Sequence, residues 1–92
     1  MLYLIKEIKG INNFELFLLF NNNEIRKVNF EPKLKEWTTS PQSKFGQLLN
    51  LNLFKTVKLD KEMETIVWEN GIDLCPNVLY EMSEPIKEFK LM

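Results

Sequence analysis

Trp68-Glu69-Asn70-Gly71-Ile72-Asp73-Leu74-Cys75-Pro76-Asn77-Val78-Leu79-Tyr80-Glu81 holds more residues with special backbone or packing roles than any other stretch of this chain. Asn70-Gly71 is a turn dipeptide that ends the strand before it. Pro76 fits the first position of a short helix, where its missing N–H costs nothing. We therefore expect an architectural role for this segment, with Trp68 in the core and Tyr80 packed on the sheet.

Residues 1–30 predict an antiparallel meander of three strands. Residues 2–9 are mostly aliphatic and aromatic and end at a turn-rich cluster, residues 10–13. The second and third strands are expected at residues 14–20 and 24–30. Three asparagines lie between them and suit a tight hairpin, because asparagine tolerates a positive φ better than other non-glycine residues.

The second predicted strand is apolar on both faces. By alternation, its residues are Phe14, Leu16, Leu18 and Phe20 on one side and Glu15, Phe17 and Leu19 on the other. Such a strand is either central and covered twice, or covered once and used at an interface. Phe17 and Leu19 are therefore the candidate surface for a partner.

The middle of the chain predicts short helices joined by loops. Pro32 ends the meander because it has no N–H for the ladder, and residues 32–37 can form one helical turn. Residues 38–43 are the most loop-like part of the chain. Ser43 can cap a short helix, and we expect residues 51–54 to form an irregular turn.

A second hairpin completes the predicted fold. Residues 54–60 alternate, residues 65–68 are β-branched and aromatic, and residues 61–64 make the turn. The predicted class is α+β: an antiparallel meander of about five strands with short helices, including a C-terminal helical turn after Pro76. We expect a single domain over residues 1–84 and a C-terminal tail over residues 85–92.

Composition favours an ordinary folded domain. The chain has 92 residues, of which 45% are hydrophobic and 27% charged, close to the average for globular proteins. The longest apolar run has five residues, too few to cross a bilayer, and the N-terminus does not resemble a signal peptide. We therefore expect no membrane association and a cytoplasmic location. We expect Cys75, the lone cysteine, to be a small buried hydrophobe.

The residues needed for common catalytic chemistry are absent from the sequence. The chain has no histidine, one cysteine and three unclustered glycines, so triads, zinc sites and phosphate-binding loops have no candidate residues. We predict no catalytic or metal site, no cofactor, no small-molecule substrate and no enzyme activity. A poorer, enzymatic alternative uses Asp73 with Tyr80, but we expect Asp73 to accept hydrogen bonds from backbone N–H groups ahead of Pro76.

Charge is unevenly distributed along the chain. Residues 26–61 have eight bases against three acids, whereas residues 62–92 have two bases against seven acids. The simple interpretation is two solvated faces, and the functional one is a surface for a charged partner. If that partner is nucleic acid, the candidate contacts are Arg26, Lys27, Lys33, Lys35 and Lys44.

Two patterns carry a family resemblance. They are Leu-x-x-Phe-x-x-Val-x-Leu-Asp at residues 51–60 and Trp-x-Asn-Gly-x-Asp-x-x-Pro-x-x-Leu-Tyr-Glu at residues 68–81. The chain resembles the bacterial domain of unknown function 2442 family over about residues 3–82. It departs in the turn at residues 21–23 and the loop at residues 37–43. The residues of this signature, to which no catalytic role is attached, are Trp68, Asn70, Gly71, Asp73, Pro76, Leu79 and Tyr80.

The resemblance implies a small bacterial, cytoplasmic α+β protein, often the second partner of a toxin-antitoxin-type gene pair. Some relatives carry an appended helix-turn-helix, for which we expect no room beside the predicted strands within these 92 residues. Our first functional hypothesis is therefore a non-enzymatic protein-interaction module that binds a small neighbouring protein, as an antitoxin-like partner, or binds itself. The alternative is a nucleic-acid-binding accessory protein that uses the basic segment, residues 26–61.

Overall fold

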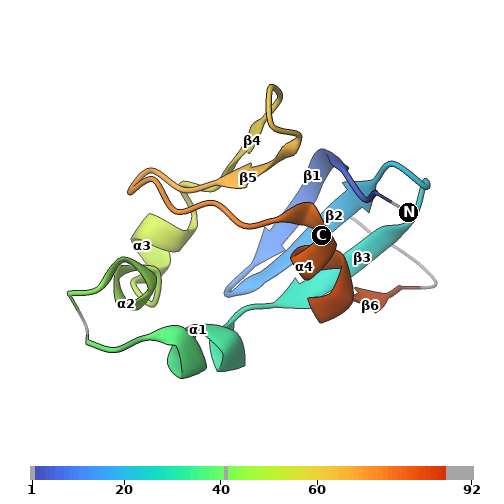
Figure 1. The fold of residues 1–92 in the computed structure, drawn as a ribbon. Helices are drawn as coiled ribbons and strands as arrows, with labels where there is room; N and C mark the ends of the chain where they lie inside the picture. Colours follow the sequence, from blue (N-terminus) through green and yellow to red (C-terminus); the bar gives the residue numbers. More distant parts are fainter. Residues whose placement is uncertain (1, 41, 87–92) are drawn as a thin grey trace.

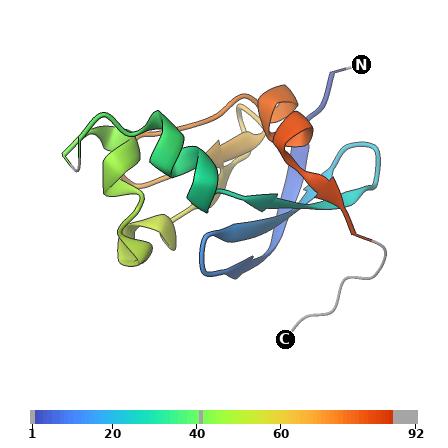
Figure 2. The ribbon, with the colours of Figure 1, turned by 90° about the horizontal axis from the view of Figure 1, so that it is seen from below.

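A computed structural model describes residues 2–40 and 42–86 of the chain (Figure 1). The elements follow in the order β1 (Ile5–Asn12), β2 (Glu15–Phe20), β3 (Ile25–Asn29), α1 (Glu31–Trp37), α2 (Lys44–Gln47), α3 (Leu51–Phe54), β4 (Lys58–Asp60), β5 (Thr65–Val67), α4 (Pro76–Met82) and β6 (Glu84–Pro85). Figures 1 and 2 show α1, α2 and α3 gathered at one end of the molecule and the four-stranded sheet at the other.

The strands form two antiparallel sheets. The larger has the order β1-β2-β3-β6, and the smaller is the β4-β5 hairpin. The predicted α+β meander with short helices is thereby confirmed. Both predicted hairpins are present, although β4 begins only at Lys58 and not at residue 54 as predicted. Asn23 adopts the positive φ of 69° that its tight turn requires.

The first strand is displaced from its predicted position. It begins at Ile5 and runs through Gly10 to Asn12, whereas the sequence analysis ended it at residue 9. Asn13, at a φ of 53°, allows a short turn to β2. Gly10 therefore lies inside the strand opposite Phe17, where the β1–β2 register is irregular.

A sixth, two-residue strand was not predicted. Pro85 of β6 lies opposite Arg26, and Glu84 lies opposite Lys27. Proline is tolerated there because β6 is at the edge of the sheet, where no further strand needs its N–H. Strand pairing therefore includes Pro85, which is the first residue of the predicted C-terminal tail. Residues 87–92 of that tail lie outside the described residues.

Local capping explains the helices around the central loop. The Ser43 side chain accepts a hydrogen bond from the backbone N–H of Gly46, as predicted. Residues 51–54 form a short helix rather than the irregular turn that we expected, because the side chain of Asn50 accepts from the backbone N–H of Asn52. Pro76 begins α4, as predicted.

The core lies on one face of the larger sheet, called the inner face here. Its residues on β2 and β3 are Leu16, Leu18, Phe20 and Val28, all fully buried. They form one cluster with residues from the other elements: Leu34 of α1, Phe54 of α3, Ile66 of β5 and Leu79 of α4. The helices and the second hairpin therefore cover the same side of the sheet.

Candidate functional site

Trp68 is a core residue, as predicted from the signature. It is only 1% exposed, and its indole Nε1 donates to the backbone oxygen of Phe54 at 2.9 Å. Its ring meets Phe30 and Phe54 at centroid distances of 5.5 and 5.6 Å. The aromatic group is therefore fully engaged in joining β5 to α3.

Asn70 fixes α2 against the chain that follows β5. Its amide nitrogen donates to the backbone oxygen of Lys44 and to the side-chain oxygen of Gln47, each at 3.1 Å. In return, the Lys44 ammonium donates to the backbone oxygen of Asn70 at 2.8 Å. Gly71 follows with a φ of 90°, which favours glycine. Asn70 and Gly71 therefore have a structural role: they hold α2 against the segment that follows β5.

Asp73 and Cys75 differ from their predicted roles. Asp73 is exposed and pairs through its backbone with Val67, and within the described residues its carboxylate forms no hydrogen bond. The backbone N–H of Ile72 is instead satisfied by the side-chain oxygen of Asn70. Cys75 is exposed, not buried, because it is the N-cap residue of α4.

Tyr80 joins three parts of the chain. Its ring stacks on Tyr3 with centroids 3.7 Å apart and planes 7° from parallel. Its hydroxyl donates to Glu24 at 2.6 Å, and the Arg26 guanidinium lies 4.0 Å from the ring centroid. The Tyr80 hydroxyl is therefore engaged with Glu24, and nothing in the described network couples it to Asp73.

These contacts change two ionisation equilibria. Hydrogen bonds from Tyr80 and Arg26 hold the pKa of Glu24 below its ordinary value, because they favour the charged carboxylate. The hydrogen bond to Glu24 raises the pKa of Tyr80 above its ordinary value, because it favours the protonated phenol.

Arg26 and Lys27 point to opposite faces of the sheet. Arg26 lies opposite Leu18 and Lys27 opposite Phe17, so the alternation of a strand sends Arg26 to the inner face. The Arg26 side chain is only 12% exposed, and it donates to Ser83 and Glu24. Lys27 forms an ion pair of 3.5 Å with Glu15 on the other face.

The remaining basic candidates lie on helices. Lys33 pairs with Glu36 at 3.6 Å, Lys35 is exposed on α1, and Lys44 is bonded to Asn70 on α2. The five bases thus come from both faces of the sheet and from two helices. Four of them have contacts within the chain, which lowers the gain available from phosphate contacts.

The second face of the sheet, called the outer face here, carries an apolar strip. Leu19 lies opposite Ile25, and Phe17 lies beside them on β2. All three are half-buried, yet none belongs to the core cluster or packs against it. The sequence analysis named Phe17 and Leu19 but missed Ile25, although alternation along the expected strand at residues 24–30 places residue 25 on the same side as Lys27.

Charged residues surround this apolar strip. Glu7 of β1 lies opposite Leu19, and Glu84 of β6 lies opposite Lys27. Glu15 also shares this face. The outer face is therefore an apolar strip (Phe17, Leu19 and Ile25) with a charged rim, in which Lys27 pairs with Glu15 and Lys9 pairs with Glu7 at 2.6 Å.

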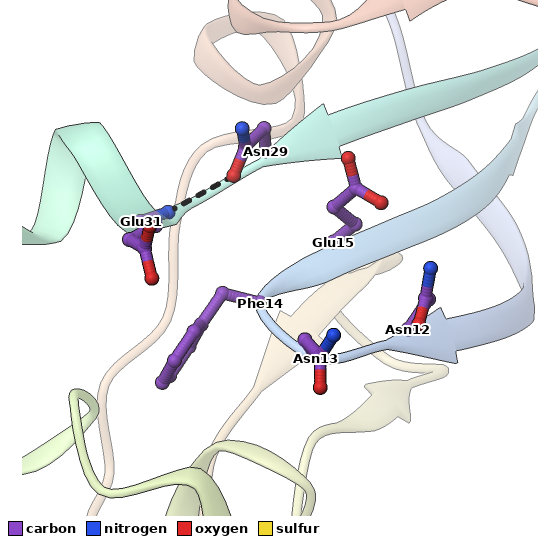
Figure 3. A pocket seen from close by; sticks show the side chains of 6 residues that line it. All are labelled: Asn12, Asn13, Phe14, Glu15, Asn29 and Glu31. Atoms are coloured by element: carbon purple, nitrogen blue, oxygen red, sulfur yellow. Dashed lines mark hydrogen bonds between the residues drawn. The ribbon is translucent and has the colours of Figure 1, made fainter.

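The surface of the described residues also has hollows, one of which, of about 210 Å³, is lined by Ile5, Lys6, Leu59, Lys61 and Glu64. An apolar one of about 280 Å³ is lined by Trp37, Phe45, Leu74 and Val78. A polar one of about 210 Å³ lies at the β1–β2 turn and the start of α1 (Figure 3). Its lining residues are Asn12, Asn13, Phe14, Glu15, Asn29 and Glu31. Within residues 2–40 and 42–86, no group of three acidic or cysteine side chains is placed to hold a metal ion.

Comparisons with known proteins identify a family and nothing more specific. The model of a family described as protein of unknown function (DUF2442) matches residues 5–85. Neither the search of curated proteins nor that of solved structures found a match. Among the described residues, no helix is long and apolar enough to cross a membrane.

Proposed function

This chain belongs to the DUF2442 family of proteins of unknown function, and from that premise we propose that it is a non-enzymatic protein-interaction module. The binding surface is the apolar strip on the outer face of the four-stranded sheet. The observation that carries this proposal is that Leu19 and Ile25 are half-buried side by side, on the face of the sheet opposite the core.

The energetics of burial support a macromolecular partner. Full burial of a leucine or isoleucine side chain contributes about 1.5–3 kcal/mol relative to full exposure. A partner that completes the burial of Leu19 and Ile25 gains a fraction of this at each residue. The charged rim, in which Glu7 and Glu15 are paired with Lys9 and Lys27, favours a partner with polar groups around an apolar centre.

The partner is a small protein encoded beside this one, and the pair is of the toxin-antitoxin type. This part of the proposal rests on the family resemblance, as do a bacterial origin and a cytoplasmic location. In such a pair, an antitoxin acts by occupying a surface of the toxin. An antitoxin role therefore requires an interface on this chain but does not require a catalytic group.

Co-expression with the neighbouring gene product tests the proposal. We expect the two proteins to co-elute in size-exclusion chromatography, and Leu19→Lys to abolish co-elution by placing a charge within the apolar strip. Met63→Lys is the matched control, because Met63 is 63% exposed at the β4–β5 turn, away from this face. Thermal unfolding of both variants establishes that they fold. Failure of the wild-type pair to co-elute, or equal loss in both variants, would contradict the proposal.

Self-association through the same strip is the second form of this proposal. It predicts that the elution volume of the isolated protein decreases with rising concentration. Leu19→Lys should then elute as a monomer at every concentration. An elution volume that does not change with concentration excludes this form.

Nucleic-acid binding through Arg26, Lys27, Lys33, Lys35 and Lys44 stays an untested alternative. It requires an affinity for DNA or RNA that falls steeply as salt rises, because each phosphate contact releases counterions. Titration at two salt concentrations tests it. Absence of binding at low salt removes the alternative.

A further inference from the structure

Asn70-Gly71 is a chemically labile dipeptide. Asn70 is the only asparagine of this chain that is followed by glycine. Because glycine has no Cβ, its backbone nitrogen can approach the side-chain amide of the preceding residue without steric hindrance. Attack of that nitrogen on the amide carbon closes a cyclic imide, the route by which asparagine loses its amide nitrogen. Gly71 is exposed, so water and hydroxide reach the dipeptide.

The fold engages both of the groups that would react. The backbone N–H of Gly71, which must give up its proton in the reaction, donates to the backbone oxygen of Trp68 at 2.9 Å. The amide nitrogen of Asn70, which would leave, donates to two oxygens of α2. These are the backbone oxygen of Lys44 and the side-chain oxygen of Gln47, each at 3.1 Å. The Asn70 side chain can therefore turn toward Gly71 only when α2 has moved away.

We propose that Asn70 is a deamidation site and that the docking of α2 controls its rate. After release of α2, the Gly71 nitrogen forms a bond to the Cγ of Asn70 and the Cγ–Nδ2 bond breaks. Nδ2 leaves as ammonia and takes the proton from the Gly71 nitrogen. Water then opens the imide, at Cγ to give aspartate or at the backbone carbonyl carbon to give isoaspartate. The reaction exchanges the amide nitrogen for a water oxygen and needs no oxidant or reductant.

The product cannot restore the docked state of α2. A carboxylate has no hydrogen to donate, so both bonds from Nδ2 to α2 are lost, and the two oxygens that accepted them repel the new charge. A rotated Gln47 amide can donate to the carboxylate, but it then loses its bond to the backbone oxygen of Gln42. The Lys44 ammonium, bonded to the backbone oxygen of Asn70 at 2.8 Å, offsets part of the loss. Deamidation therefore weakens the attachment of α2 irreversibly.

Deamidation rates of the full chain in mildly alkaline buffer test the control by α2, with peptide mass spectrometry as the measurement. We expect a slower reaction at Asn70 in the native protein than in urea. Native Gln47→Ala should react about two- to tenfold faster than native wild type, because loss of one neutral hydrogen bond raises the open population by this factor.

Gln42→Ala is the matched control, because it keeps the backbone oxygen that accepts from Gln47. It should react at the wild-type rate. Equal rates for native Gln47→Ala and Gln42→Ala would overturn the control by α2. An Asn70 that stays unmodified in urea, or that reacts equally fast in native and unfolded wild type, would overturn the proposal as a whole.

Asn70→Asp tests the consequence, because every molecule then carries the aspartate product. The backbone N–H groups of Gln47 and Leu48 form hydrogen bonds at α2. We expect them to exchange with solvent about tenfold faster than in wild type, the effect of losing one to two neutral hydrogen bonds, while β2 exchanges at the wild-type rate. Unchanged exchange at Gln47 and Leu48, or an equal acceleration in β2, would overturn the local release of α2.

Discussion

At the scale of the residue, Tyr80 shows how the signature stabilises the fold. One side chain contacts Tyr3 near the N-terminus, Glu24 in the β2–β3 turn and Arg26 on β3. These residues are between 54 and 77 positions away in sequence. Such long-range contacts form only in the folded chain, so their loss lowers stability without changing any local propensity. The acid-base chemistry of the pair Glu24–Tyr80 makes this contribution depend on pH.

The first prediction concerns that pH dependence. The pKa of Glu24 is lower in the folded protein than its ordinary value near 4.5, so the charged form stabilises the fold above that value. This stability is lost as the pH falls through the lowered pKa. The pKa of Tyr80 is raised above its ordinary value near 10, so its contribution is present below pH 10 and is lost as the pH rises through the raised pKa.

Urea unfolding between pH 2 and pH 7 measures the Glu24 contribution. We expect Tyr80→Phe to be less stable than wild type near neutral pH and to lose less stability on acidification, because Glu24 has lost its donor. Glu24→Gln is the control, since its amide oxygen still accepts from Tyr80 but does not titrate. Parallel acid profiles for wild type and Glu24→Gln would contradict the assignment.

At the scale of the element, close approach explains a glycine in the first turn of α2. A Cβ at Gly46 would overlap the backbone oxygen of Ser40 and lie 2.6 Å from the Oγ1 of Thr38. The loop between α1 and α2 thus packs directly on the helix that Ser43 caps. Its conformation depends on the absence of a side chain at this position.

The second prediction is that Gly46→Ala destabilises the protein by about 1–3 kcal/mol, the usual cost of an overpacked site. The alanine methyl group must displace the backbone of the loop, which a side-chain rotation cannot relieve. Chemical denaturation gives the magnitude. Gln42→Ala, an exposed position in the same loop, should change stability by less than about 0.5 kcal/mol. Equal stability of Gly46→Ala and wild type would contradict the close approach.

The elements that the sequence predicted well are those with a local signal. Alternation located β2, β3 and the second hairpin, and the capping residue Ser43 located α2. β6 has only two residues and pairs with β3, which is far away in sequence. Neither a hydrophobic alternation nor a turn sequence could therefore predict it. The sequence analysis also grouped Arg26 with Lys27 by charge, although alternation along the expected strand at residues 24–30 already places neighbouring residues on opposite faces. Only the register shows which of the two faces the core.

The candidate surface was predicted in part. Alternation alone placed Phe17 and Leu19 on the face opposite Leu16 and Leu18, and the structure finds that face outside the core. The composition of the rim required the register between four strands, which the sequence does not contain in any local form. The exposure of Cys75 was likewise unpredictable from composition, because it follows from the position of one residue before a helix.

At the scale of the whole molecule, Arg26 connects the sheet to the C-terminal elements. Its guanidinium donates to the side chain and backbone of Ser83, between α4 and β6, while it also contacts Glu24 and Tyr80. A planar group with several donors in fixed directions is needed to reach all these partners at once. A lysine retains the charge but cannot make the same set of bonds.

The third prediction follows from this geometry. Arg26→Lys should destabilise the protein by about 1.5–3 kcal/mol, the range for hydrogen bonds that involve a charged group. Hydrogen exchange should become faster in α4 and β6 before it does in β1 and β2, because Arg26 bonds to the segment between α4 and β6. Lys27→Arg is the matched control: it changes the neighbouring base on the outer face and should alter stability by less than about 0.5 kcal/mol. These two variants also distinguish a structural role of Arg26 from a role in nucleic-acid binding. Both variants keep the positive charge on which nucleic-acid binding depends, so only a structural role predicts a difference in stability between them. Equal stability of the two variants would mean that Arg26 acts only as a charge, whereas a loss confined to Arg26→Lys assigns it to the closure of the fold.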